Sequence, residues 1–278
     1  MAWLLISGDF SFILNMAEEN IDRKSEDLFP QEEFKEMVEA GVFYGRRKSK
    51  TYPKMKPYVL TNRGGIEIIN LEKTLDGLKK ILEFVEVKVR AGGLLLLVGT
   101  QPPAFQGITE LAKKYNYPFV INRWLGGTIT NFKVIMSRVE YLKKLRNDAK
   151  SGALDKYTKK EKAQFEAEIN RLEELLGGLE NLTRLPDVMV VIDSNLHTTA
   201  VREAKRAKIP VVAFANVDSD PEMLDYYIVG NNKSKKSVTW FLSKLDLAIE
   251  EAKKASAVLA VEIKTKEEDK VAIATDKT

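Results

Sequence analysis

The sequence predicts an α/β fold: a three-layer domain with a mainly parallel sheet, into which a helical hairpin is inserted. The first observation is a series of five short, continuous apolar runs, most of them followed by a loop and then a helical stretch. Such runs are typical of parallel strands covered on both faces. The second observation is a segment of roughly sixty residues, between the second and third runs, that has no strand signal. The five runs are 94–98, 119–121, 188–192, 211–214 and 227–229.

The inserted segment predicts an antiparallel coiled-coil hairpin that projects from the sheet domain. Each of its halves has an apolar stripe at helical spacing, and the stripe of the second half has the steps of a coiled-coil seam. Thr158 and Glu161 fit a capping box at the start of the second helix, and Ser151-Gly152 supplies the turn. The alternative is two ordinary helices packed on the body. The stripes are Phe132, Ile135, Val139, Leu142 and Leu145, then Phe165, Ile169, Leu172, Leu176 and Leu179.

Ahead of the first apolar run, the sequence predicts a small hairpin and a long helix. Two short strands, 58–61 and 66–69, flank a turn at 62–65. Asn70 can cap the helix that follows, and Gly92 marks its end.

These elements divide the chain into four predicted parts. They are an N-terminal extension (1–31), the α/β domain (32–130 and 180–255), the helical coiled-coil hairpin (131–179) and a mobile tail (256–278).

The apolar N-terminus does not have the pattern of a signal peptide. No basic residue precedes the apolar run within residues 1–15, and Asp9 interrupts it. The run is also too short to span a bilayer. We therefore expect a soluble, cytoplasmic protein. Met16 is a second candidate start, which would leave residues 1–15 as a mispredicted leader or an unusual arm.

The composition removes most catalytic chemistry. The chain has no cysteine and one histidine, His197, which excludes thiol catalysis and His-rich metal clusters. The segment 99–103 (GTQPP) lacks the later glycines and the lysine of phosphate-binding loops. Asp193 and Asp218 at strand ends could bind Mg²⁺ but are equally suited to turns and caps. We predict no enzyme, no cofactor, no metal site and no small-molecule substrate, and we interpret His197 as a bystander.

Positive charge is concentrated outside the N-terminus. Residues 1–40 contain ten acidic and three basic side chains, giving −7, and the whole chain carries +4, so the remainder carries +11. This net positive charge on the remainder of the chain favours a polyanionic partner.

The segment 46–56 is the most informative basic stretch, with six cations among its eleven residues and no anion. Cations of this kind suit phosphates, and interleaved aromatic faces can stack on unpaired bases. Two prolines are expected to hold the loop extended. A solvated basic loop is the alternative. The aromatic residues and prolines are Tyr44, Tyr52, Tyr58, Pro53 and Pro57.

Further candidate RNA-binding residues lie in three places. The segment 233–236 begins the last helix, where a phosphate could meet free N–H groups. In the loop 122–128, Trp124 is expected to pack beneath the turn and present its N–H, while Arg123 can contact phosphate. Cations of the first hairpin helix can instead form a solvated face. The full set is Arg46, Arg47, Lys48, Lys50, Tyr52, Lys54, Lys56, Arg63, Arg123, Lys133, Lys143, Lys144, Arg146, Lys233, Lys235 and Lys236.

A series of motifs in fixed order resembles a known family. They are GVFYG (41–45), PKMKPY (53–58), IINLEKT (68–74), VGT (98–100), RWLGGTITN (123–131), LPD (185–187), IPV (209–211) and DSDP (218–221). Together, over about residues 32–250, they resemble the universal family of the second protein of the small ribosomal subunit, in its bacterial form.

The resemblance implies a flavodoxin-like sheet with an inserted coiled-coil hairpin. It also implies a scaffold held on small-subunit ribosomal RNA near the head–body junction, beside neighbouring ribosomal proteins and, where present, the large mRNA-binding ribosomal protein. Three departures stand out. Phe43, Tyr44 and Arg46 lie in the motif where the family commonly has histidines, 101–103 replaces basic residues, and the first thirty or so residues have no family counterpart.

The sequence therefore favours a ribosomal scaffold that binds RNA. Two other classes stay open at this point. One is a protein-interaction adaptor that uses the hairpin without RNA, and the other is a nucleotide-dependent enzyme with a site at the carboxyl edge of the sheet.

Overall fold

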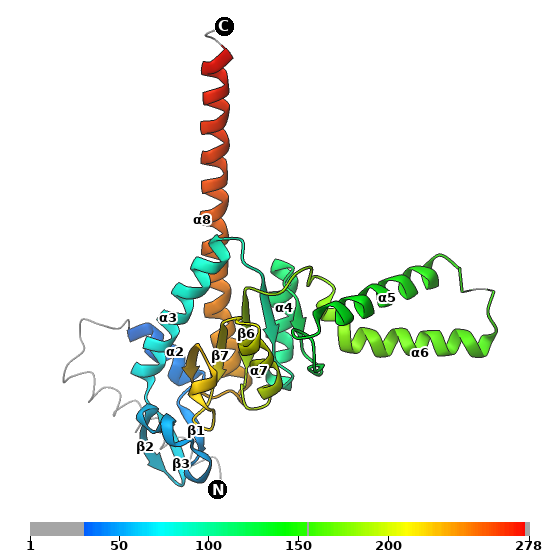
Figure 1. Cartoon of the computed structure of the whole chain (residues 1–278). Coiled ribbons are helices and arrows are strands. Elements are labelled where there is room, and N and C mark those ends of the chain that lie inside the picture. Colours follow the sequence, from blue (N-terminus) through cyan, green and yellow to red (C-terminus); the bar gives the residue numbers. More distant parts are fainter. Residues whose placement is uncertain (1–30, 155, 276–278) are drawn as a thin grey trace.

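The computed structural model describes residues 31–154 and 156–275, with side chains for 32–154 and 156–256. At its centre lies a parallel sheet (Figure 1). It has five strands in the order β5-β4-β6-β7-β8. Counted along the chain this order is 2-1-3-4-5, the flavodoxin-like one. The α/β class and the five predicted strands are confirmed. The strands are β4 (Leu95–Val98), β5 (Phe119–Val120), β6 (Val188–Ile192), β7 (Val211–Ala215) and β8 (Tyr226–Val229).

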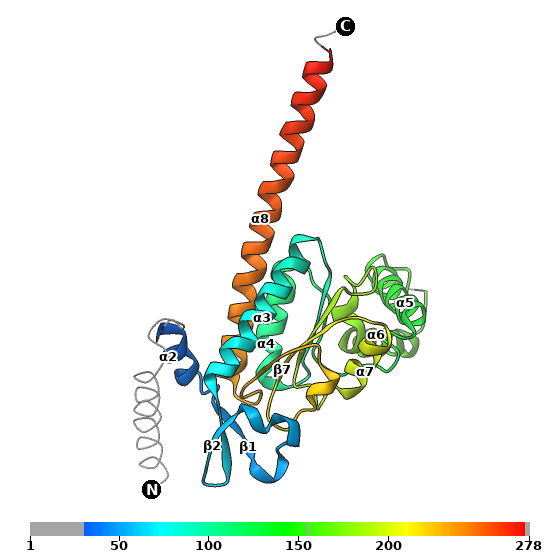
Figure 2. The same ribbon diagram turned by 60° about the vertical axis from the view of Figure 1, so that its left-hand side comes forward.

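Helices cover both faces of this sheet, which is why its strands are apolar throughout (Figures 1 and 2). Along β4, Leu95 and Leu97 pack into one core cluster, while Leu96 and Val98 pack into the other. The first cluster is completed by α3, α4 and α8, and the second by α7 and the sheet-proximal part of the hairpin. The bounds are α3 (Leu71–Arg90), α4 (Pro102–Tyr115), α7 (Thr198–Arg206) and α8 (Lys235–Thr275).

Helix α3 also covers the outer edge of β8. The Thr74 hydroxyl donates to the Val229 carbonyl oxygen over 2.8 Å. At Gly77 a Cβ atom would lie 2.9 Å from the Tyr227 carbonyl oxygen, so the absence of a side chain there permits the close approach. As predicted, Asn70 caps this helix, accepting from the backbone N–H of Glu72 over 2.9 Å. Covering an edge strand in this way protects it from pairing with other chains.

A second, three-stranded antiparallel sheet lies at the end of the molecule opposite the α8 projection (Figure 1). Its order is β1-β3-β2, and its strands are β1 (Tyr44–Arg47), β2 (Val59–Arg63) and β3 (Ile66–Ile69). The predicted turn between β2 and β3 is present, with Gly64 and Gly65 at φ of 57° and 81°. β1 has no apolar alternation and was not predicted. It forms because β3 offers it a free edge.

The expectation that 46–56 is an extended loop is wrong. After β1 the chain forms two 3-10 turns, η1 (Lys48–Lys50) and η2 (Pro53–Tyr58). Pro53 occupies the first position of η2, where the fixed φ and missing N–H of proline are tolerated. Met55 is fully buried among Ile69, Val217 and Val229, and this packing draws the segment onto the body.

Two helices, α5 (Phe132–Lys150) and α6 (Lys159–Leu176), form the inserted segment and project from the sheet domain (Figure 1). The capping box of Thr158 and Glu161 is present, and Gly152 turns the chain at φ 75°. Both predicted stripes face the same core cluster. Coiled-coil packing between the two helices stays a prediction, as do the domain boundaries.

The remaining expectations concern the two ends of the chain, the N-terminal extension and the C-terminal tail. The first described helix is α2 (Gln31–Glu39). The rest of the predicted extension, with the alternative start at Met16, lies outside the described residues. α8 continues to Thr275 through most of the predicted tail (Figure 2), and the mobility of that tail stays a prediction. No helix of the described part is long and apolar enough to cross a bilayer.

Candidate nucleic-acid interface

The fold brings the first and last basic segments of the chain together at the carboxyl edge of the parallel sheet. Arg46 Nη2 donates to Asn232 Oδ1 over 3.1 Å, and its Nε lies 3.4 Å from Asp218 Oδ2. On the same edge, Lys233 Nζ lies 3.0 Å from Asp193 Oδ2. A depression of about 360 Å³ opens between them, lined by Arg46, Lys50, Asp193, Asn195, Leu196, Asp218 and Lys233.

The two strand-end aspartates are thereby neutralised by cations of this chain. Asp193 also accepts from the buried Gln101 side chain and has φ of 68°. Within the described residues, no group of three or more metal-ligating side chains gathers. The ordinary ligand position of an open α/β sheet is therefore used for internal contacts, which join β1 and the start of α8 to the sheet.

His197, interpreted from the sequence as a bystander to catalysis, is a structural link between two strand ends. It is buried at 3% exposure. The Thr100 backbone N–H donates to His197 Nε2 over 3.2 Å, so the ring proton lies on Nδ1 and is donated to the Asp193 carbonyl oxygen over 2.8 Å. Burial lowers the pKa of His197 below its ordinary 6.5. The neutral ring thus connects the ends of β4 and β6.

The loop between β5 and α5 is held by a carboxylate that sequence reasoning missed. Glu203 on α7, 8% exposed, accepts from the Trp124 indole N–H over 3.1 Å and from the Gly127 backbone N–H over 2.8 Å. It also accepts from the backbone of Ile129 over 3.0 Å. Burial alone would raise the pKa of Glu203, but these hydrogen bonds hold it below its ordinary value. Trp124 packs and presents its N–H as expected, and Arg123 is exposed beside it.

Several predicted RNA-binding side chains are engaged inside the protein. Arg146 pairs with Glu173 over 3.1 Å and with Glu180 over 2.9 Å, and so holds the base of the hairpin together. Lys54 pairs with Glu222. The further engaged cations are Arg46, Lys143, bonded to the Glu180 carbonyl oxygen, Lys233, and Lys235, bonded to Gln106. Such contacts compete with phosphate.

Other predicted cations are exposed and form no hydrogen bond or ion pair with the side chains that the structure describes. They lie on η1 and η2, on the small sheet, on the loop after β5, on the hairpin and at the start of α8. This set is Arg47, Lys48, Lys50, Lys56, Arg123, Lys133, Lys144 and Lys236. Arg63 is also exposed, at the end of β2.

The greatest local surplus of positive charge belongs to the small sheet and its turns. Residues 44–66 contain seven cations and no carboxylate, and the first acidic residue after them, Glu67, is buried at 6% exposure. Thr51 donates its hydroxyl hydrogen bond to that carboxylate. The exposed surface of this sheet is therefore positively charged, because no exposed carboxylate within residues 44–67 offsets its cations.

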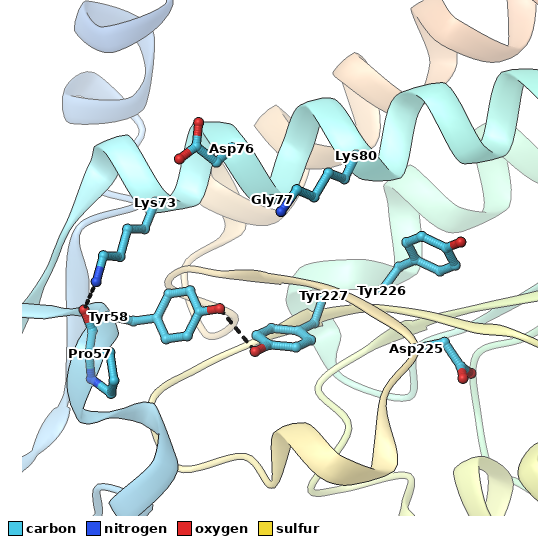
Figure 3. Close-up of a pocket in the computed structure, with 9 residues that line it drawn as sticks. All are labelled: Pro57, Tyr58, Lys73, Asp76, Gly77, Lys80, Asp225, Tyr226 and Tyr227. Atoms are coloured by element: carbon cyan, nitrogen blue, oxygen red, sulfur yellow. Dashed lines mark hydrogen bonds between the residues drawn. The ribbon is translucent and has the colours of Figure 1, made fainter.

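The aromatic residues expected to stack on bases are largely used internally. Tyr52 packs with the buried Met55 cluster. Tyr58 shares a 2.9 Å hydrogen bond between hydroxyl groups with Tyr227, inside a groove of about 470 Å³ between α3 and β8 (Figure 3). Lys73 donates to the Pro57 carbonyl oxygen at one end of this groove. Its wall carries two lysines and two aspartates, so it has no surplus of charge.

Fold and surface together define an α/β scaffold whose strand ends serve structure and whose excess positive charge lies on a separate small sheet. The family model of ribosomal protein S2 matches residues 37–252, and the chain belongs to this family. The resemblance seen in the sequence is thus confirmed. Proteins of this family are structural and non-enzymatic, which agrees with the prediction that this chain is not an enzyme.

Two relatives give the extent of the similarity. The chain is 44% identical to the small ribosomal subunit protein uS2 of Bdellovibrio bacteriovorus over 207 residues, which cover 74% of this chain and 66% of that protein. It is 38% identical to the small ribosomal subunit protein uS2 of Dehalococcoides mccartyi over 233 residues, covering 84% of this chain and 95% of that protein.

Proposed function

We propose that this protein is a structural constituent of the small ribosomal subunit and binds small-subunit ribosomal RNA near the head–body junction. The observation that carries the RNA contact is the carboxylate-free segment 44–66, whose exposed cations lie on one small sheet and on the two 3-10 turns between its strands. Phosphate contacts need such cations, and an RNA partner supplies the missing negative charge.

The proposal extends to neighbouring ribosomal proteins, with the large mRNA-binding ribosomal protein as one candidate. The projecting α5–α6 hairpin supports this part, since it extends well beyond the sheet domain and offers long exposed helical faces (Figure 1). On this proposal the protein works bound to ribosomes in the cytoplasm during translation.

Sedimentation tests the assignment. Tagged full-length protein, run through a sucrose gradient in a native lysate, is expected with small subunits and with whole ribosomes. Exclusive recovery from the ribosome-free fractions would overturn it.

A charge series tests the RNA surface. The triple substitution Arg47→Gln, Lys48→Gln and Lys50→Gln is expected to weaken RNA binding and to flatten its salt dependence. The reason is that each phosphate contact releases counterions, and the variant forms fewer such contacts. The matched control removes three exposed cations from α4 and α7, Lys113, Arg202 and Arg206, and should behave as the unmodified protein. If the triple variant binds RNA unchanged, these cations are not the RNA contact; if the unmodified protein binds partner proteins but no RNA, the chain acts as a protein adaptor instead.

A further inference from the structure

The strand register of the small sheet places an exposed isoleucine between two arginines. Arg47 of β1 and Arg63 of β2 are both directly opposite Ile66 of β3. Directly opposed residues of antiparallel strands project from the same face. Ile66 is 41% exposed, and both arginines are exposed. We call these three residues the arginine–isoleucine patch.

The patch lies at the free tip of the sheet. The two arginines are separated by two strand spacings, about 10 Å between their backbones. Beside them, a Cβ added at Gly64 or Gly65 would meet no atom within 4 Å, so the turn faces open space. Figure 2 shows this hairpin extending beyond the body. A large partner can therefore reach the patch.

The exposed side chain of Ile66 indicates which kind of partner the patch binds. Cations alone would suit any polyanion, whereas an isoleucine held between two guanidinium groups suits a surface with negative rims and a less polar floor. The minor groove of A-form RNA has this character, because it is wide and shallow, displays sugars and base edges, and is bordered by phosphates.

A single-stranded partner fits less well. Sequence-tolerant binding of unpaired bases uses aromatic faces. The patch has none, and the ring of Tyr44 on β1 packs against Phe43 with centroids 4.2 Å apart.

We propose that the arginine–isoleucine patch docks on the minor-groove side of a double-helical RNA segment. Arg47 and Arg63 contact phosphates on the two rims, and Ile66 lies against the sugars between them. The inference rests on the proposed function and adds to it the form of RNA that this surface recognises.

A tethered probe tests the docking in the assembled particle. Because the chain has no cysteine, Asn62→Cys gives a single attachment point beside the patch for an iron–EDTA group. Subunits assembled with this variant are expected to show hydroxyl-radical cleavage on both strands of one paired RNA segment. Lys113→Cys on α4 is the control and should not cut that segment. Cleavage confined to unpaired nucleotides, or none from the Asn62 position, would overturn the inference.

Failure of the proposed function looks different in this experiment, since the protein would then not enter small subunits at all. Incorporation without paired-strand cleavage therefore removes only the docking mode.

Binding of defined nucleic acids separates the three side chains. The probe is a mixed-sequence RNA duplex longer than ~16 base pairs, compared with the same sequence as DNA duplex and as single-stranded RNA. Arg47→Gln and Arg63→Gln should each reduce the slope of log affinity against log salt by about 1. Ile66→Thr should lower RNA-duplex affinity about threefold to tenfold with the slope unchanged, because the lost contact is apolar.

The control for Ile66→Thr is Leu247→Thr on α8, an apolar side chain that is 55% exposed. Threonine is well accepted in strands, so the Ile66 variant should fold, which its thermal melting checks. Equal effects of the two substitutions, or an equal Ile66 effect on the DNA duplex or the single strand, would contradict minor-groove docking.

Discussion

Trp124 donates its indole N–H to Oε1 of Glu203 over 3.1 Å and so ties the loop after β5 to α7. The other oxygen of the same carboxylate accepts from the backbone of Ile129 and Thr130 over 3.0 and 3.2 Å. One buried side chain thereby satisfies several donors of a loop that leads directly into the hairpin. It therefore anchors to α7 the loop from which α5 starts.

Replacing that carboxylate should destabilise the protein strongly. Glu203→Ala leaves buried donors without acceptors, a loss expected to be about 2–4 kcal/mol in the free energy of unfolding. Denaturant titration measures it. Glu110→Ala, at an exposed position on α4, is the control and should stay within about 0.5 kcal/mol. A loss as small as the control's would mean that water replaces the carboxylate readily.

Glu203 also predicts a loss of stability in acid. Its folded pKa lies below its ordinary 4.5, so the contribution is present above the unfolded pKa and disappears as pH falls through the folded pKa. Stability measured from pH 6 downward should therefore decline less steeply in Glu203→Gln than in the unmodified protein.

His197 predicts a second dependence of stability on pH. The effect can be assigned to this residue because it is the one histidine of the chain. Burial lowers its folded pKa below 6.5. Below that value the unfolded chain binds the proton more readily than the folded protein does, so stability falls as pH drops below about 6.5.

The His197 effect can be isolated by substitution. His197→Gln has no group that titrates in this window, so its stability should be flat between about pH 5.5 and 7.5. Urea midpoints at several pH values provide the measurement. The same slope in both proteins would show that another group is responsible.

The ion pair of Arg46 with Asp218 predicts an energetic coupling between the two sheets. Both side chains are about four-fifths buried, at 23% and 21% exposure, so the pair is shielded more than a surface pair. A double-mutant cycle with Arg46→Gln and Asp218→Asn should give a coupling of about 0.5–1.5 kcal/mol. Additivity of the two single effects would show that the contact is incidental.

The parts of the fold that depend on local pattern could be predicted from the sequence. Continuous apolar strands such as 188–192 have one acceptable environment, a sheet buried on both faces. The helix starts at Asn70 and Thr158 are set by side chains within three residues. These signals are local, and the structure has each of them.

The features that were missed depend on contacts between distant residues. β1 forms against β3, whose residues lie about twenty positions further on. η2 forms because Met55 is buried against Ile69 of β3, Val229 of β8 and Val217 in the loop after β7. The acceptor role of Glu203 had one available signal, a carboxylate on the apolar face of α7. Which donors it would meet depended on the tertiary fold.

Gly77 predicts a stability defect from the smallest possible side chain. In a helix, Gly→Ala alone would stabilise by about 1 kcal/mol. Here the new Cβ would lie 2.9 Å from the Tyr227 carbonyl oxygen, a backbone atom that cannot move without shifting β8. Overpacking of this kind outweighs the propensity gain, so Gly77→Ala should destabilise by about 1–3 kcal/mol.

Thermal melting gives the measurement for Gly77, with a matched glycine as control. At about 2–4 °C per kcal/mol for a domain of this size, Gly77→Ala should lower Tm by several degrees. A Cβ at Gly126 would meet no atom within 4 Å, and its φ is not positive. Gly126→Ala should therefore leave Tm unchanged or raise it slightly, because the unfolded chain loses entropy. If Gly77→Ala also raises Tm, α3 can withdraw from β8, and the close packing that covers this edge strand is not required for stability.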